Sequence, residues 1–526
     1  MQSSTQKISQ ATYRTLFWLL LLGFTVFRLT FADKFGLGVD ESHYFLYARH
    51  LAWGYFDHPP MVAFLAALTT FLGENVFYIR LGPIICSTLS FIMMRYLALA
   101  LYRDERVAFS AAMLLLLMPY QHLLMVALLP DAPLNLFWCG ALLMCWRAVQ
   151  TDRRLPWILA GLLFGGALLS KYHAFLLPLC LLGYLITSPN HRFWLGKLQP
   201  YLAVLVGLVV FVPNILWNAN HGWISYGYQL GRGSNAEFNM GKFVLAIGGQ
   251  FGVWSPVIFG LLIAAFVVII RQKKLNDADR FVIWTSLPVF AFFCANGLTS
   301  KILPHWTSVG WWTGAIAIAS VMVKKIEQPA KAGIRWRRWF LTAAVTGLVM
   351  SAVLYVAIGW PIAGPVYSWA RQVSLNINQH IPTIKPLEPF EIGYDLSNEL
   401  FGWDTIAHKV ESIRTQMPNP GKTFIFGHRF FRISQLAVYL SPETIATSLH
   451  HKFDQYRFWF SAEDHKGWDA VFIVDQKRHI ERADRYLPLF DKMDPEPVDI
   501  KIFRNKRLAQ NYKIYKYFGF KGNYEK

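Results

Sequence analysis

The feature that most constrains this chain is its series of long apolar segments. A helix that spans a bilayer needs about 20 mostly apolar residues, and many windows of the 526-residue chain meet that condition. Charged residues make up 16% of the chain, whereas an ordinary soluble domain has about 25%. The sequence therefore predicts a polytopic α-helical membrane protein, not the several soluble domains that length alone would suggest.

We expect about eleven transmembrane helices from the hydropathy pattern. The apolar run 61–72 is too short to span a bilayer and is predicted to be an interfacial or re-entrant helix. The expected spans are 15–32, 79–101, 107–129, 132–149, 156–172, 174–188, 199–217, 243–269, 281–297, 306–322 and 340–360.

Lysine and arginine are distributed unequally between the two sets of connections. Nineteen lie in the N-terminal tail and in residues 102–106, 147–154, 189–197, 271–280 and 323–338, but only seven lie in the opposite connections. Positive charge is retained on the cytoplasmic side, so we expect a cytoplasmic N-terminus. The formal net charge of +19 then reflects a basic face toward anionic lipid and requires no nucleic acid.

The composition changes after residue 360. We expect residues 1–360 to form the transmembrane domain, with a first outer loop at 33–78, and residues 361–526 to form an outer α/β domain. Short β-like runs occur at 423–426, 470–474 and 498–503, alternation occurs at 512–520, and 432–440 is helical in pattern. All five cysteines lie within predicted spans, so this domain has no disulfide framework.

The first outer loop contains an unusual polar stretch, "VDESHYFLYARHLAWGYFDHPPM", residues 39–61. It includes the adjacent acids Asp40 and Glu41, and two histidines, His43 and His58. Acids in this position are typical of a helix cap and an acidic first turn, which is the structural alternative to a catalytic role. A cap also holds its carboxylate rigidly, so the two interpretations are compatible.

Other outer connections also contain ionisable residues. Asp131 lies in "LLPDAPL", Lys171 lies in "SKYHA", and Lys301 and His305 lie in "LTSKILPHW". Arg232 lies in the connection 218–242. Helix capping at Asp131, snorkelling of Lys171 and an interfacial belt around His305 are the alternatives to substrate binding. His122 lies deeper in a predicted span, where polar residues are functional candidates.

The sequence lacks a Walker loop, a dinucleotide fingerprint, His-Glu-x-x-His and Gly-x-Ser-x-Gly. We therefore do not expect this protein to use a soluble nucleotide as its substrate. Outward acids and bases at the lipid boundary favour a reaction whose activated substrate is a lipid phosphate.

The ordered set "DESHY", "GYFDHPPM", "RLGPI" and "LLPDAPLNLFW" resembles bacterial glycosyltransferases of the GT-C superfamily. The nearest groups are glycosyltransferase family 39, with the protein O-mannosyltransferases, and the aminoarabinose transferases of lipid A. The resemblance covers roughly residues 10–320. The tail segments "LFGWDTI", "FFRISQLAVYL" and "FDQYRFW" resemble the outer domain of one bacterial branch.

The resemblance implies an enzyme of the bacterial inner membrane that takes a sugar from an undecaprenyl-phosphate-like carrier on the periplasmic face, with inversion. Asp40 then matches the general base, Glu41 its partner, and Asp131 an acid that binds the acceptor or orients Asp40. The residues implied in substrate binding are His43, Tyr44, His58, Lys171, Arg232, Lys301 and His305. The branch has an arginine and a lysine where this chain has His43 and His58, so the phosphate is held differently or a divalent ion takes part.

Lipid A or lipopolysaccharide core is the favoured acceptor, and a protein acceptor is the alternative within the same fold. A membrane transporter is the alternative from another class. A transporter would need ionisable residues near the midplane and two similar halves, whereas the polar residues here cluster outside and no half-repeat is visible.

The charge asymmetry predicts the location of the C-terminal domain. A topology reporter fused after residue 400 should be active only in the periplasm, because an odd number of spans separates it from a cytoplasmic N-terminus. The paired measurement is an alkaline phosphatase fusion and a fluorescent-protein fusion at the same position. A cytoplasmic signal would contradict the topology and the span count together.

Overall fold

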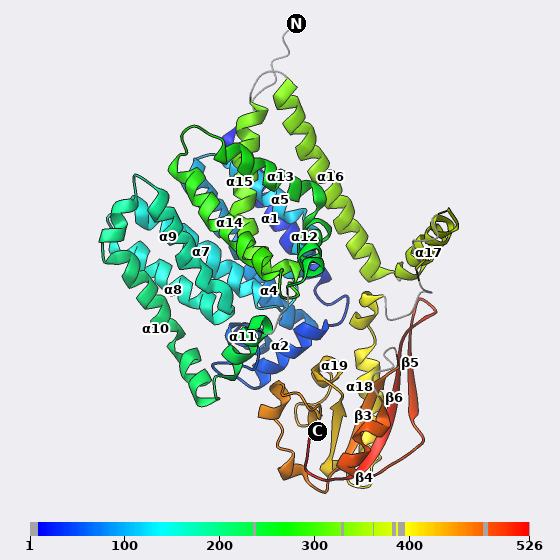
Figure 1. The fold of residues 1–526 in the computed structure, drawn as a ribbon. Coiled ribbons are helices and arrows are strands. Elements are labelled where there is room, and N and C mark those ends of the chain that lie inside the picture. Colours follow the sequence, from blue (N-terminus) through cyan, green and yellow to red (C-terminus); the bar gives the residue numbers. More distant parts are fainter. Residues whose placement is uncertain are drawn as a thin grey trace. The chain divides into compact units, whose positions relative to one another are not determined.

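The structure, a computed structural model, describes residues 9–234, 238–327, 331–360, 362–380, 386–387, 395–476 and 482–524. Its contacts divide the chain into two units (Figure 1). The first unit comprises Met1–Ala32 and Leu51–Ala352, and the second comprises Asp33–His50 and Val353–Lys526. The boundary expected at residue 360 stays a prediction, but the beginning of the first loop belongs to the second unit.

The first unit is helical. Its helices are α1 (Gln10–Phe31), α3 (Met61–Thr70), α4 (Val76–Tyr102), α5 (Glu105–Leu116), α6 (Pro119–Leu124), α7 (Asp131–Gln150), α8 (Arg154–Ser170), α9 (Leu176–Thr187), α10 (Gln199–Asn220), α11 (Ile224–Ser234), α12 (Met240–Trp254), α13 (Pro256–Ile270), α14 (Asp277–Asn296), α15 (Ser308–Ile326) and most of α16 (Lys331–Gly359).

Seven helices in the described part of the chain are long and apolar enough to cross a membrane, and the bent pair α12–α13 raises the number to eight. The expected count of eleven is not confirmed. The expected spans 156–172 and 174–188 coincide with shorter apolar helices, and 61–72 contains the ten-residue helix α3.

Two prolines divide segments that the hydropathy pattern treats as continuous. Proline lacks the backbone N–H and clashes with the preceding turn, so it can kink or end a helix, although Pro83, Pro213 and Pro288 lie within continuous helices of this chain. Pro119 opens α6 after α5 has ended at Leu116, within the expected span 107–129. Pro256 opens α13 at a bend of 109° from α12, within the expected span 243–269.

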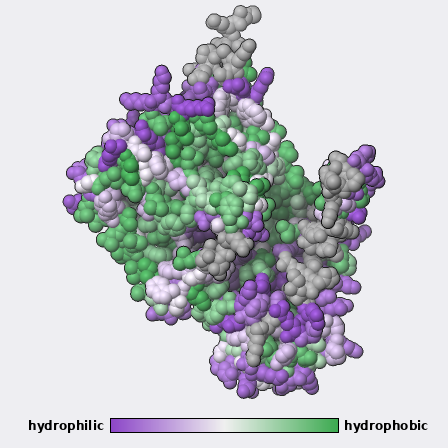
Figure 2. All heavy atoms as spheres, viewed as in Figure 1, coloured by the Kyte–Doolittle hydropathy of each residue, from purple (hydrophilic) through white to green (hydrophobic). Residues whose placement is uncertain are grey.

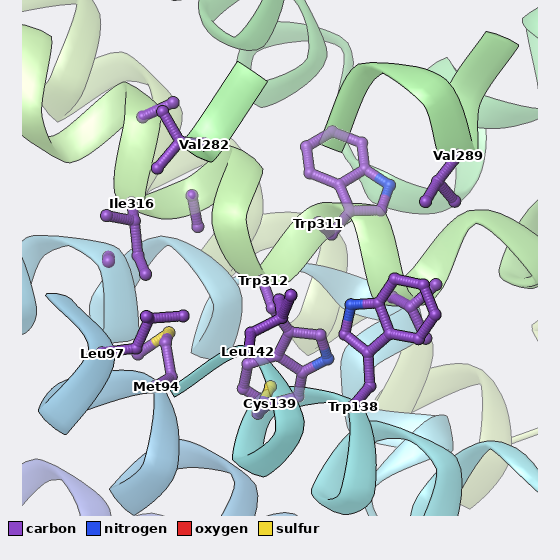
Figure 3. Close-up of a cluster of buried hydrophobic side chains, with 14 of the residues drawn as sticks. Met94, Leu97, Trp138, Cys139, Leu142, Val282, Val289, Trp311, Trp312 and Ile316 are labelled. Atoms are coloured by element: carbon purple, nitrogen blue, oxygen red, sulfur yellow. The ribbon is translucent and has the colours of Figure 1, made fainter. Parts of the chain in front are cut away.

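Large side chains from α4, α7, α14 and α15 fill the core of the first unit. Figure 3 shows Trp138 of α7 beside Trp311 and Trp312 of α15, with Met94 and Leu97 of α4 nearby. All three tryptophans are at most 1% exposed. Hydrophobic side chains also dominate the visible surface of this unit (Figure 2), as expected where lipid is the solvent.

Helices α8 and α10 approach closely through glycine. A Cβ on Gly161 would lie 2.4 Å from the carbonyl oxygen of Ala203, and one on Gly165 would lie 2.5 Å from Cβ of Val210. The spacing Gly161-x-x-x-Gly165 is the small-residue pattern that lets membrane helices pack backbone to backbone.

The second unit contains α2 (Val39–Arg49), α17 (Ala363–His380), α18 (Trp403–Thr415), α19 (Phe430–Val438) and a six-stranded sheet. The strands are β1 (Thr423–Gly427), β2 (Ala446–Ser448), β3 (Asp469–Asp475), β4 (Phe490–Met493), β5 (Val498–Arg504) and β6 (Arg507–Phe520). The four predicted strand segments correspond to β1, β3, β5 and β6, and the predicted helix 432–440 corresponds to α19. The prediction of a sheet-containing domain is confirmed.

The sheet has the order β2-β1-β3-β6-β4, with β5 paired to β6. Strands β2, β1 and β3 are parallel, whereas β4 and β5 run antiparallel to β6, as β6 does to β3. Alternate residues of β1 and β3 face two separate cores. Ile425, Val471 and Ile473 pack with α18 and α19, while Phe424, Phe426 and Phe472 pack on the opposite face.

Helix α2 is packed against α19 of the second unit. Arg49 Nη1 donates to the carbonyl oxygen of Ala437 at 2.9 Å, and Gln435 Nε2 donates to that of Leu37 at 3.2 Å. Leu46 is part of the core formed by α18 and α19. Residues 33–50 and the C-terminal part of the chain therefore contribute to one folded unit.

The close approach of α8 and α10 predicts a difference between two glycine-to-alanine substitutions. Gly165→Ala should destabilise the protein by about 1–3 kcal/mol, because the new methyl group collides with Val210. Gly260→Ala, within α13, has no atom within 4 Å of the new Cβ and should be neutral or stabilising through helix propensity. Thermal unfolding in detergent checks both variants, and equal melting temperatures for the two would contradict the packing argument.

Candidate functional site

An ion pair is buried at the first residue of α7. Both carboxylate oxygens of Asp131 accept from Nζ of Lys171, each at 2.9 Å. Asp131 is 1% exposed and Lys171 is 8% exposed. A charge removed from water at this depth is tolerated only with a close partner, so each residue fixes the other.

Local backbone structure places the two charges. Asp131 follows Pro130 and begins α7, so its carboxylate lies at the positive end of the helix dipole. Lys171 ends α8: its N–H donates to the carbonyl oxygen of Ala167 at 2.9 Å, and its own backbone is extended. The structural alternative, in which Lys171 snorkels to water at a helix end, does not agree with an ammonium group that is buried against Asp131.

Three histidines surround this ion pair. Asp131 interacts electrostatically with His173 and His305, and His58 interacts with both of these histidines. The Tyr120 hydroxyl lies 3.1 Å from Nδ1 of His305, and the two rings are stacked. We call Asp131, Lys171, His58, His173 and His305 the α7 cluster. It combines one anion, one cation and three imidazoles that can donate to or accept from a polar ligand.

His58 belongs to the α7 cluster through electrostatics and is also close to its sequence neighbour. Its Nδ1 lies 3.2 Å from a carboxylate oxygen of Asp57. Asp57 is fixed in turn by Gln229 of α11, whose Nε2 donates to its carbonyl oxygen.

The acidic pair of the first loop lies in the second unit, on the first turn of α2. Gly38 is the N-cap residue, and its N–H donates to Oε2 of Glu41 at 2.9 Å. Glu41 therefore supplies the returning half of a capping box, because Gly38 has no side chain to make the other bond. Asp40 is exposed on the same turn. The structural alternative of capping thus applies to Glu41.

His43 and Tyr44 are buried between α2 and α19. His43 Nε2 lies 2.9 Å from the Tyr47 hydroxyl, and its Nδ1 lies 3.3 Å from the Ser434 hydroxyl. Tyr456 approaches that same hydroxyl at 2.9 Å, and burial raises the pKa of Tyr456 well above its ordinary value. Both ring nitrogens of His43 are therefore engaged by hydroxyl groups of the second unit.

The remaining predicted residues are placed differently. Lys301 is exposed before the turn that contains His305. Arg232 lies on α11, and its side chain is outside the described residues. His122, on α6, contacts the ring of Phe24 and interacts electrostatically with Arg28.

Sequence reasoning did not select His173 or Tyr120 as site residues. His173 lies in "SKYHA", two positions after Lys171, so spacing alone could have suggested it. Tyr120 was hidden because 107–129 reads as one continuous span. Among the described residues, no group of three or more His, Cys, Asp or Glu side chains is arranged to hold a metal ion.

Comparison with known proteins gives relatives for most of the chain. Residues 57–217 match the family model described as dolichyl-phosphate-mannose-protein mannosyltransferase. Lipid A galacturonosyltransferase RgtD of Rhizobium johnstonii is 28% identical over 57% of this chain and 63% of its own. An undecaprenyl phosphate-alpha-4-amino-4-deoxy-L-arabinose arabinosyl transferase of Pseudomonas paraeruginosa is 30% identical over 65% of this chain and 66% of its own. The aligned region thus covers just under two thirds of each relative.

The fold matches over nearly the whole chain. The crystal structure of ArnT from Cupriavidus metallidurans in the apo state superimposes with a TM-score of 0.60 at 16% identity, covering 95% of this chain and 98% of ArnT. The form bound to undecaprenyl phosphate gives the same TM-score. The chain is therefore similar in sequence to these bacterial transferases and has the GT-C fold of ArnT, that of a multi-pass helical membrane protein with a C-terminal sheet-containing domain. The resemblance inferred from the sequence motifs is confirmed.

The buried ion pair generates a stability prediction. Lys171→Met should destabilise the protein by about 3–5 kcal/mol, because it leaves the Asp131 carboxylate buried without its cation. The double variant Asp131→Asn/Lys171→Met should recover most of this loss, since it buries no net charge. Melting temperatures of wild type, both single variants and the double variant complete the cycle. A double variant as unstable as the sum of the single variants would show that the pair is not coupled.

Proposed function

We propose that this chain is a membrane glycosyltransferase that transfers a sugar from a polyprenyl-phosphate carrier to an acceptor of the bacterial envelope. The observation that carries the proposal is the superposition with ArnT over 95% of the chain, including the form bound to undecaprenyl phosphate. The relatives named for lipid A and for an undecaprenyl phosphate-linked donor support the same chemistry.

Asp40 is the proposed general base. Of the three candidate acids, Asp131 is ion-paired with Lys171 and Glu41 accepts a hydrogen bond at the helix N-terminus. Asp40 is exposed on the same turn as Glu41. In the proposed reaction an acceptor hydroxyl attacks the anomeric carbon and loses its proton to Asp40. The bond between that carbon and the phosphate oxygen breaks with inversion, and the phosphate leaves with the electron pair.

The α7 cluster is proposed to stabilise the negative charge of the phosphate group that leaves. A leaving phosphate gains negative charge in the transition state and needs donors fixed in advance. His58, His173 and His305 can supply such donors, and Lys171 adds a cation held rigidly by Asp131. Lys301, Arg232, His43 and Tyr44 remain proposed binding residues on the resemblance alone. Assistance by a divalent ion is the alternative way of holding the phosphate that the resemblance implies.

Lipid A or lipopolysaccharide core is the proposed acceptor, and the reaction is assigned to the periplasmic face of the inner membrane. One relative is named for lipid A, and the other is named for an undecaprenyl phosphate-linked sugar; both support this acceptor. The charge asymmetry of the connections supports a periplasmic active site. The family model named for a protein acceptor matches residues 57–217, which keeps protein O-glycosylation as the second candidate.

Mass spectrometry of the envelope separates these acceptors. Cells with and without the protein should differ in the sugar substitution of lipid A or core, with unchanged glycoproteins. Loss of protein glycosylation with unchanged lipids would select the second candidate. Sugar transfer from a polyprenyl-phosphate donor by the purified protein in detergent separates both from a transporter, which would give none.

Replacement of the proposed base separates catalysis from structure. Asp40→Asn should lower kcat by about 10² to 10⁴, the usual contribution of a general base, with an unchanged melting temperature. Glu41→Gln is the matched control, because glutamine still accepts from the Gly38 N–H in a capping box. Its loss of turnover should be much smaller.

Asp131→Asn extends the comparison. If Asp131 acts through binding, part of its effect should appear in KM. Turnover of Asp40→Asn within about threefold of wild type, far less than a base contributes, would remove Asp40 from the mechanism and would transfer the role to Glu41 or Asp131.

A further inference from the structure

Helix α17 has an apolar face that the described fold does not cover. Four large apolar side chains of this helix are exposed, at intervals of three, four and four residues: Val366, Trp369, Val373 and Ile377. We call them the α17 stripe, because at 3.6 residues per turn they lie within about 80° of one another around the helix axis. Trp369 is 69% exposed. A surface helix with this spacing has one face suited to an apolar environment.

The other side of α17 is mostly polar and is partly covered by the chain itself. Nε of Arg371 donates to the carbonyl oxygen of Leu387 at 3.1 Å, and the Ser374 hydroxyl accepts from the N–H of Leu387 at 2.9 Å. The remaining polar positions of this side are Ser368, Gln372, Asn378 and Gln379. In the described part of the chain, no other helix or strand packs extensively on α17. The α17 stripe is therefore an exposed apolar face that needs an occupant.

The preceding helix indicates what that occupant is. Helix α16 is one of the helices that are long and apolar enough to cross a membrane, and its apolar part comprises 27 residues, 333–359. At 1.5 Å per residue this part extends about 40 Å, which is about the thickness of a bilayer with its headgroups. Apolar side chains remain exposed toward the end of the helix, at Leu348, Val353 and Val356. The end of α16 therefore lies at the level of the lipid headgroups.

A short turn connects α16 to α17. Because each extended residue advances the chain by at most about 3.5 Å, Ala363 lies within about 14 Å of Gly359. The N–H of Trp360 donates to the carbonyl oxygen of Val356, and the N–H of Ile362 donates to that of Trp360, each at 2.7 Å. Trp360 is 66% exposed, and tryptophan is enriched at membrane–water interfaces. Helix α17 therefore begins at the bilayer surface.

The composition of α17 selects a mode of membrane binding. The helix contains no aspartate or glutamate, and its basic residues are Arg371 and His380. Helices that are recruited to anionic lipid have a polar face rich in lysine and arginine. Because α16 already holds α17 at the membrane, burial of the apolar stripe is sufficient and charge attraction is not needed.

We propose that α17 lies in the surface of the bilayer at which α16 ends, with the α17 stripe buried among lipid chains. The occupant of this face is phospholipid, and the contact is apolar. The second unit is then attached to the membrane at α17 as well as through α16. This attachment is independent of the proposed transfer reaction, because none of its residues belongs to the α7 cluster or to the first turn of α2.

Spin labels on the two sides of α17 test this proposal in lipid nanodiscs. Val373→Cys and Ile377→Cys place a nitroxide on the α17 stripe, while Ser368→Cys and Gln379→Cys place it at exposed positions of the polar side. The five native cysteines are replaced by alanine in this background. Oxygen concentrates in lipid and a nickel chelate stays in water, so the ratio of their collision rates reports where each label lies. We expect a ratio several-fold higher for the stripe labels than for the polar-side labels.

The lipid composition and the pattern of collisions separate the alternatives. The ratios should be the same in phosphatidylcholine and in equal parts of phosphatidylcholine and phosphatidylglycerol, since the contact is apolar. Lipid contact only in the anionic mixture would overturn the proposal, as would equal ratios on both sides of the helix. Stripe labels that collide with neither reagent would overturn it by showing a protein cover, and magnetic broadening between labels would identify that cover as a second copy of the chain.

Hydrogen exchange in nanodiscs provides a test that needs no cysteine substitution. A single helix of 18 residues is marginal in water, so protection of the α17 amides depends on the bound face. Trp369→Gln should speed their exchange by about tenfold or more, because burial of a large apolar side chain favours the bound state by at least that factor.

Ser368→Gln is the matched control, because it introduces the same residue at the neighbouring position on the polar side. Serine and tryptophan have similar helix propensities, so exchange in this control should stay within about twofold of wild type. Equal effects of the two substitutions, or α17 amides that exchange in wild type as fast as an unfolded peptide, would overturn the proposal.

Discussion

A carboxylate buried at the start of a hydrophobic helix must be neutralised where it stands, and much of the first unit follows from that requirement. Asp131 begins α7, and its partner Lys171 ends α8, so the two helices must pack with these ends together. The ion pair sets the position of His173, two residues further along the chain. Around this fixed charge the imidazoles of His58 and His305 complete the α7 cluster.

The second constraint is that a polar loop between membrane helices needs its own support. Residues 33–50 obtain it from the C-terminal part of the chain, because Gly36 N–H donates to the carbonyl oxygen of Leu400 at 2.8 Å and α2 packs on α19. The capping box at Gly38 and Glu41 then fixes the first turn. Asp40 is consequently held on a short rigid helix, which suits a residue that has to meet a substrate in one orientation.

The sequence predicted what depends on local pattern. Period-two alternation identified β6, apolar runs identified β1 and β3, and the absence of charge identified the helical unit. The division of 107–129 at Pro119 and of 243–269 at Pro256 was readable from proline chemistry but was masked by hydropathy. The packing of His43 against Ser434, 391 positions away, could not be predicted, because no periodicity specifies which distant helix covers a given face.

His43 and His58, the two histidines of the first-loop motif, illustrate how far a motif determines a role. His43 has both ring nitrogens beside hydroxyl groups and its ring against Phe430, so its type is explained by packing between α2 and α19. His58 lies beside the Asp57 carboxylate and interacts electrostatically with His173 and His305. The choice of histidine at position 58 is therefore explained by its electrostatic neighbours. The same substitution pattern in the sequence therefore has two physical causes.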